Sequence, residues 1–203
     1  MEKRLIVALL ILGFVALTST VPSQRSVTPS VQASGERTMV LDVACDARTC
    51  RINQVDPTVP QPGLNFARGD TFIVDGTIYP GSTIPPGGTF DTPSPFGPDE
   101  PGRIGTWVCR GTFNLSAAEA EAGAAPHIST TQLFLLDDGN GLVTEGSEGG
   151  LPMVLRAVTG GLGDFNGVRG QVTEEELGVN STGLFNFRMV FEIENQTESR
   201  RQP

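Results

Sequence analysis

Apolar and polar residues alternate along much of the chain, and the alternation is clearest close to its C-terminal end. One side of an extended strand there carries only apolar side chains: Phe185, Phe187, Met189, Phe191 and Ile193. The opposite side carries amide and charged side chains: Asn186, Arg188, Glu192 and Glu194. This period of two residues indicates a β-strand that buries one face and exposes the other to water.

Seven further segments have the same strand-like character, and turns rich in Gly, Asp or Asn separate them. The eight predicted strands are Thr38–Ala44, Asp70–Tyr79, Ile104–Asn114, Ser129–Leu136, Leu142–Gly146, Met153–Thr159, Val168–Leu177 and Leu184–Glu194. Long helical patterns are nearly absent, and the chain has 25 Gly and 15 Pro residues, which favours turns. The pattern therefore predicts an all-β, eight-stranded antiparallel barrel. The Gly- and Pro-rich segment 80–102 is predicted to be a long exposed loop that caps one mouth of the barrel.

The first residues have the pattern of an export signal. Lys3 and Arg4 precede an apolar run from Leu5 to Leu17, which is shorter than the roughly 20 residues of a membrane span. We expect a signal peptide over residues 1–23, or as far as residue 33 in a second interpretation. A flexible lead-in over 24–37, a barrel domain over 38–195 and a polar tail over 196–203 follow. The protein is expected to be secreted, without stable membrane insertion after cleavage; an uncleaved anchor is the alternative.

The net charge of the chain limits its possible partners. The net charge of −9 argues against nucleic acid and against anionic lipid surfaces, because both need a basic protein face.

Cys45 and Cys50 flank a short polar loop, and we expect a disulfide between them in an oxidising compartment. Cys109 lies alone in a strand-like run. It is interpreted as a buried apolar thiol, and a reactive thiol is the alternative.

The sequence contains few of the residues that hydrolytic enzymes and metal sites use. His127 is the only histidine, and no Gly-x-Ser-x-Gly turn accompanies it. A zinc site would have to rely on carboxylates and on thiols that we expect to be bonded. We therefore predict no metal site and no cofactor.

The segment Ala157–Val172 reads A-V-T-G-G-L-G-D-F-N-G-V-R-G-Q-V. It resembles the signature of plant allene oxide cyclases, close to A-V-T-G-G-x-G-x-F-x-G-A-x-G-Q-V. It is also similar to the G-G-T-G-x-F-x-x-A-R-G of dirigent proteins, including their arginine, here Arg169. The resemblance implies a secreted, bacterial-type member of this barrel family, with eight antiparallel strands around an apolar lumen. Such barrels often associate with one another, so a homo-oligomer is left open.

The sequence does not contain the catalytic residues of the plant cyclases at the matching positions. The family's asparagine on the second strand falls on Gly76, beside Asp75, and its cysteine on the third strand falls on Trp107, two residues before Cys109. The first strand offers Asp42 and no glutamate. The resemblance thus implies the scaffold without allene oxide cyclisation. It leaves Asp42, Asp75 and Cys109 as catalytic candidates.

The sequence predicts that a small apolar molecule binds in the lumen. The residues expected to line that lumen are Phe72, Val74, Ile78, Trp107, Cys109, Phe185, Phe187, Met189 and Phe191. Two alternatives stay open. One is a cyclase or dirigent-type enzyme, an isomerase that restrains an apolar intermediate during cyclisation or coupling. The other is a structural secreted barrel with a packed interior.

Overall fold

The computed structural model describes residues 36–57, 66–116, 118–119, 122–124, 127–148 and 153–195. The predicted signal peptide and the predicted polar tail lie outside these residues. No helix among the described residues is long and apolar enough to cross a membrane.

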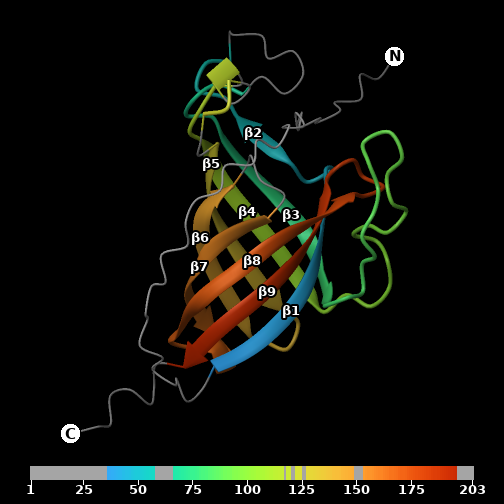
Figure 1. Ribbon diagram of the computed structural model, residues 1–203, viewed down its shortest axis with the longest axis vertical. Coiled ribbons are helices and arrows are strands. Elements are labelled where there is room, and N and C mark those ends of the chain that lie inside the picture. Colours follow the sequence, from blue (N-terminus) through green and yellow to red (C-terminus); the bar gives the residue numbers. More distant parts are fainter. Residues whose placement is uncertain are drawn as a thin grey trace, which may run out of the picture.

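Eight long antiparallel strands form a closed barrel, as the alternation predicts (Figure 1). The strands are β1 (Glu36–Cys45), β2 (Arg51–Asn53), β3 (Thr71–Pro80), β4 (Gly105–Phe113), β5 (Ile128–Leu136), β6 (Gly141–Glu148), β7 (Met153–Leu162), β8 (Val168–Val179) and β9 (Phe185–Asn195). Neighbours in the barrel follow the chain from β3 to β9, and β1 closes it between β9 and β3. The three-residue β2, which the sequence analysis does not predict, continues along the edge of β3 beyond the end of β1.

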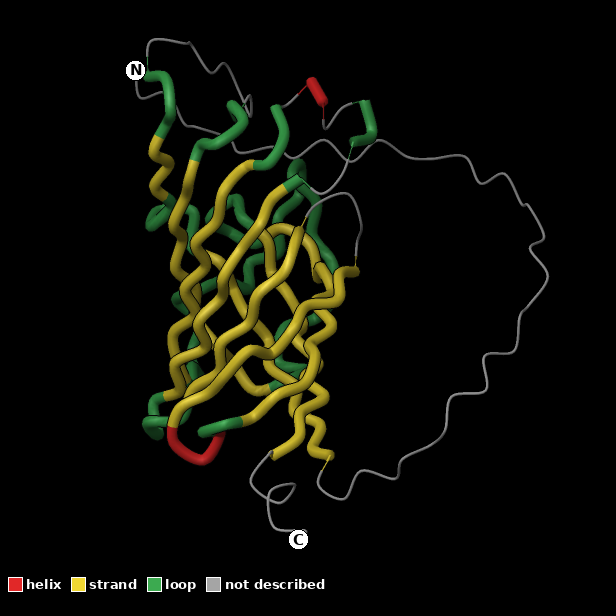
Figure 2. The backbone as a smooth tube through the Cα atoms, turned by 90° about the vertical axis from the view of Figure 1, so that its left-hand side faces the viewer, coloured by secondary structure: helices red, strands yellow, loops and turns green. Residues whose placement is uncertain are grey.

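One end of the barrel has an apolar floor. There the short 3-10 helix η1 (Gly163–Phe165) connects β7 to β8, and the Phe165 side chain is buried beneath Arg37. Phe134 and Phe191 meet edge to face inside the barrel, with ring centroids 5.1 Å apart. We call this end the η1 end; it carries the red segment at the bottom of Figure 2. The opposite end, where β1 ends and β3 begins, is the β2 end.

The long loop between β3 and β4 lies against the outer wall and not over a mouth of the barrel (Figure 1). Its Ile84 is fully buried against Tyr79, Ala44 and Leu177, and Phe96 packs on the same cluster. The backbone N–H of Gly87 also donates to the Leu177 carbonyl at 2.8 Å. The expectation of a capping loop is therefore wrong, because apolar residues of the loop find a partner surface on the outside of β1, β3 and β8.

Candidate functional site

Six polar side chains gather inside the barrel between the apolar floor and the β2 end. They come from four neighbouring strands and are Thr130 and Gln132 of β5, Thr144 and Glu148 of β6, Arg156 of β7 and Glu174 of β8. All except Glu148 are at least nine-tenths buried, and the Glu148 side chain is 18% exposed. We call this group the acid cluster. Buried charges in a protein interior need ion pairs and hydrogen bonds, so each contact in the cluster matters.

Arg156 is the centre of the acid cluster. Its side chain has no exposed surface, and its Nη1 lies 2.6 Å from Oε1 of Glu148. Its Nε lies 3.8 Å from Oε2 of Glu174 and 3.4 Å from the hydroxyl of Thr144, to which it donates. Nη2 donates to the backbone carbonyl of Thr130 at 3.2 Å. One guanidinium therefore faces two carboxyl groups, so the cluster has one positive charge for two acids.

Gln132 connects the two acids. Its amide nitrogen donates to Oε2 of Glu174 at 2.8 Å and to Oε1 of Glu148 at 2.9 Å. The Thr130 hydroxyl donates to the same Glu148 oxygen at 2.5 Å. Thr144 donates to the Gln132 carbonyl oxygen at 3.3 Å, which fixes the orientation of the amide. The two carboxyl groups are thus held by one rigid set of strand residues.

Burial raises the pKa of Glu174 to about 8, and the negative charge of Glu148 acts in the same direction. Arg156 and the hydrogen bond from Gln132 oppose this change without cancelling it. Glu174 is therefore mainly protonated at neutral pH. A protonated carboxyl beside an ion-paired carboxylate is the arrangement that serves general acid and base catalysis.

Two thiols share the interior with the acid cluster. Cys109 of β4 and Cys45 at the end of β1 are both buried in the barrel core. Burial raises the pKa of each thiol, and the charges of Glu148 and Glu174 raise it further. Both thiols are therefore neutral at physiological pH. This state agrees with the interpretation of Cys109 as an apolar thiol and makes neither cysteine a ready nucleophile.

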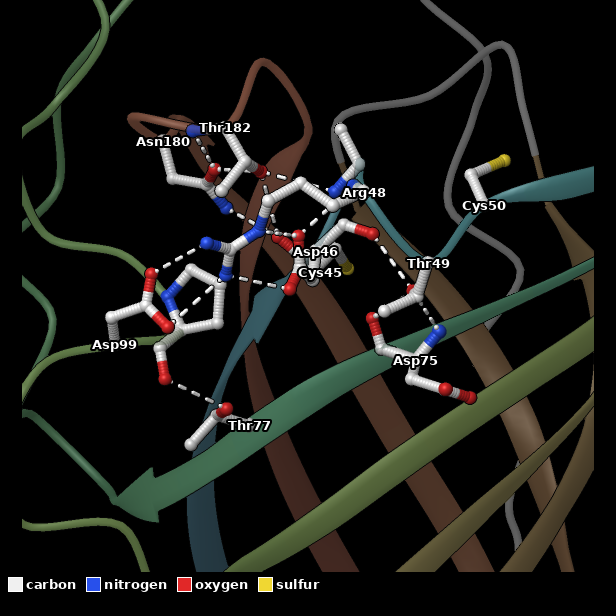
Figure 3. A network of polar contacts seen from close by, with 12 residues as sticks. Cys45, Asp46, Arg48, Thr49, Cys50, Asp75, Thr77, Asp99, Asn180 and Thr182 are labelled. Atoms are coloured by element: carbon white, nitrogen blue, oxygen red, sulfur yellow. Dashed lines mark hydrogen bonds and ion pairs between the residues drawn. The ribbon is translucent and has the colours of Figure 1, made fainter.

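A network of polar contacts fixes the chain just after Cys45 (Figure 3). Nδ2 of Asn180 donates to the carbonyl of Cys45 at 2.8 Å. The backbone N–H of Ala47 donates to the Thr182 hydroxyl at 3.1 Å. Thr49 accepts the backbone N–H of Asp75 at 2.9 Å. The turn therefore leaves β1 in a defined direction, with the Cys45 side chain inside the barrel.

The predicted disulfide is not formed in this structure. Cys45, Cys50 and Cys109 are all free thiols. Cys45 is buried in the core at the end of β1, whereas Cys50, after the polar turn of residues 46–49 and just before β2, is half-buried at the edge of the same core. Close spacing along the chain is thus not sufficient to pair these two residues.

The two aspartates proposed as catalytic candidates do not face the lumen. Asp42 lies between the inward-facing Leu41 and Val43, and its carboxylate is buried under the β3–β4 loop, where it pairs with Arg188 at 2.9 Å and accepts the Ile84 N–H at 2.8 Å. Asp75 of β3 also points outward, because it lies between Val74 and Gly76, which face the core. Both candidates are therefore removed from the site. Among the three catalytic candidates, Cys109 alone faces the acid cluster, and a catalytic role for it stays a prediction.

Most of the residues expected to line the lumen are in the barrel core. Six are buried there: Val74, Ile78, Trp107, Cys109, Met189 and Phe191. Phe72 and Phe187 are partly buried against the same core. Phe185 lies at the start of β9, where its ring meets those of Phe90 and Phe187. Binding of a ligand by these residues stays a prediction.

The acid cluster was not predicted from the sequence, although strand parity points to it. Glu174 falls on the same side of β8 as Val172, and Arg156 falls on the same side of β7 as Val158. A charged residue that keeps the parity of buried valines is the signal that could have found them. Within the described residues, no group of three or more His, Cys, Asp or Glu side chains is placed to hold a metal ion.

An open depression of about 720 Å³ lies over β3–β6 near the β2 end. Its walls are formed by Thr71, Phe72, Arg110, Gly111, Thr112, Ser129, Thr130, Thr131, Glu145 and Gly146. Thr130 also bonds Glu148, and the backbone of Gly146 lies against the Arg156 side chain. The depression is therefore adjacent to the acid cluster.

No family model and no curated protein sequence matches this chain. Solved structures that share its fold include two dirigent proteins. The pterocarpan synthase dirigent protein PsPTS1 has a TM-score of 0.58 at 13% identity, over 81% of this chain and 97% of that chain. The pterocarpan synthase dirigent protein GePTS1 has a TM-score of 0.55 at 15% identity, over 86% of this chain and 99% of that chain. These similarities confirm the dirigent-type barrel that segment 157–172 predicts.

Proposed function

We propose that this protein is an exported cyclase of the dirigent type, which closes a ring in a small and largely apolar molecule by acid catalysis inside the barrel. The observation that carries this proposal is the pairing of a protonated Glu174 with an ion-paired Glu148 on one amide, that of Gln132. The dirigent-type fold of two named synthases supports it. Export rests on the predicted signal peptide.

The reaction that suits this pair is the addition of a hydroxyl group to a conjugated carbonyl in the same molecule. Glu174 gives its proton to the carbonyl oxygen while the hydroxyl oxygen bonds to the β-carbon and loses its proton to Glu148. The resulting enol then returns its O–H proton to Glu174, and Glu148 delivers a proton to the α-carbon. The product is an isomer of the substrate, both acids regain their starting states, and no oxidant or reductant is required.

The rest of the barrel restrains the substrate. The strands fix the acid cluster within a hydrogen-bonded sheet, and the apolar floor below it excludes water. Holding the reacting atoms close together removes much of the entropic barrier to ring closure. A barrel of this kind therefore needs few catalytic side chains beyond the two acids.

Carriage of an apolar ligand without chemistry is the second candidate function. The apolar side chains that share the interior with the acid cluster favour it, because an apolar surface can bind an apolar ligand without reacting with it. Under this function the acid cluster would bind a ligand oxygen and leave its covalent bonds unchanged.

The test uses 2′-hydroxychalcone, a neutral enone that carries the required hydroxyl group and cyclises to a flavanone with a new stereocentre. We expect the wild-type protein to accelerate ring closure and to give one flavanone enantiomer in excess by chiral chromatography. Glu174→Gln should abolish both effects, whereas Glu175→Gln should keep them, because Glu175 is the exposed neighbour on the outer face. Racemic flavanone at the uncatalysed rate from the wild-type protein would overturn the proposal and favour ligand carriage.

A further inference from the structure

Trp107 carries a buried hydrogen-bond donor that has no partner. It is the only tryptophan of the chain, and its side chain, on β4, is 2% exposed. Among the described residues, its Nε1 is the single buried side-chain nitrogen or oxygen without a hydrogen bond. Buried polar groups are nearly always bonded, and an indole N–H can only donate. An acceptor from outside the chain would complete this site.

The position of Trp107 connects it to the acid cluster. Cys109, two residues along β4, faces the same side of the strand and pairs in the sheet with Gln132 of the acid cluster. Two residues of a strand span about 6.8 Å, so the Trp107 backbone lies roughly that much nearer the floor than Cys109 and Gln132. In the sheet, Trp107 pairs with Gly76 on one side and Phe134 on the other.

The wall of the barrel is shaped to accept the indole. A Cβ at Gly76 would lie 3.0 Å from Cε3 of Trp107 and 2.8 Å from the carbonyl oxygen of Ala44. Any side chain at this position would therefore displace the ring or the β1 backbone. The absence of a side chain at Gly76 lets the indole lie close against β3, with its orientation set by the sheet.

We propose that the Trp107 Nε1–H donates a hydrogen bond to an oxygen atom of the ligand in the lumen, and that the ligand is a neutral, ring-containing molecule with a carbonyl or ether oxygen at its inner end. This inference deepens the proposed function, since it rests on a ligand that enters the same lumen. The chemistry of the surroundings sets the ligand class. Phe134 provides an apolar wall, Glu148 disfavours an anionic ligand, and Arg156 is already engaged by both acids.

The single indole makes the test direct. In a protein labelled with ¹⁵N-tryptophan, one indole N–H signal reports on Trp107 alone. The probes are 1-tetralone and tetralin, which share a fused two-ring shape and differ by one ketone oxygen. We expect 1-tetralone to move the indole proton signal downfield and to bind about five- to tenfold more tightly than tetralin, as one hydrogen bond provides.

Trp107→Phe keeps an aromatic ring and removes the donor, so it should bind the two probes equally. Equal affinity of the wild-type protein for both probes, or an unmoved indole signal at saturation with 1-tetralone, would overturn the inference even if the variant fails to fold. Glu174→Gln separates this inference from the proposed function. Suppose that the indole shift persists in Glu174→Gln and that the wild-type protein has no cyclase activity. This result would support the Trp107 binding site and refute the proposed cyclase activity.

Discussion

Removal of the buried arginine is the sharpest test of the acid cluster. Arg156→Met keeps a long apolar side chain in a position that has no exposed surface. It also takes away the one basic side chain that pairs with Glu148 among the described residues, at 2.6 Å. Glu174 needs no such partner at neutral pH because it is already mainly protonated. The cost of the substitution therefore falls on Glu148, which must take up a proton or stay charged without a partner.

The size of this cost follows from the pH. A glutamic acid that titrates near pH 4.3 in the unfolded chain costs about 3.7 kcal/mol to hold protonated at pH 7, at about 1.36 kcal/mol per pH unit. At pH 5 the same proton costs about 1 kcal/mol. The pH 7 figure agrees with the roughly 3–5 kcal/mol lost when one partner of a buried ion pair is removed. We therefore expect Arg156→Met to destabilise the barrel by about 3–4 kcal/mol at pH 7 and by about 1 kcal/mol at pH 5.

Urea unfolding of both proteins at pH 5 and pH 7 measures the difference. Arg103→Met is the matched control, because Arg103 pairs with Asp137 on the surface, where both side chains are more than half exposed. Such a surface pair contributes at most about 1 kcal/mol, so the control should change little at either pH. An equal loss of stability for Arg156→Met at the two pH values would refute the buried acid cluster.

Three further predictions concern other parts of the structure. Because folding raises the pKa of Glu174, the folded state holds its proton above the pH at which the unfolded chain loses it. Stability should thus fall as pH rises from about 5 to about 8, and Glu174→Gln should remove this contribution in urea melts. Arg188→Ala should lower the free energy of unfolding by about 3 kcal/mol, because it leaves the Asp42 carboxylate without its ion-pair partner under the loop. Loss of a solvent-exposed arginine without such a partner would lower it by under about 0.5 kcal/mol. Gly161→Val should lower the melting temperature in calorimetry, since a Cβ there would lie 2.5 Å from the Phe165 carbonyl oxygen; an unchanged midpoint would contradict the packing of this turn.

The architecture could be predicted because side chains along a barrel strand alternate between the inside and the outside, with a period of two residues. In β9, Met189, Phe191 and Ile193 are buried in the core, as their spacing indicates. The turn motif at Ala157–Val172 then identified the barrel type. The pattern could not reveal β2, since three residues are too few to show a period.

The outer wall shows a limit of the two-residue pattern. Parity assigns Asp42 and Arg188 to the outside of the barrel, and the structure agrees. Outside does not mean exposed here, because the β3–β4 loop covers the wall and buries the Asp42 carboxylate completely. A single strand carries no information on which distant loop will lie over it.

The acid cluster was not predicted for a different reason, although its parity matches that of buried valines. Glu174 stands in a run of three glutamates, and such a run is usually interpreted as a solvated edge, because burial of an isolated charge is costly. What compensates this cost is Arg156 and Gln132, which lie on other strands and far away in the sequence. The compensation becomes visible only when the register of β5 to β8 is known.

That register also explains why the barrel can hold a polar site at all. The strands that supply the acid cluster supply the apolar floor as well, since Phe134 is two residues from Gln132 on β5 and Val172 is two residues from Glu174 on β8. Each polar side chain is therefore fixed by the same backbone ladder that packs the floor. Loosening of the floor should move the acids, and repacking of the floor should leave them in place. For this reason a Phe134→Leu variant should lose stereochemical control of ring closure before it loses the fold, because restraint depends on packing that is tighter than folding requires.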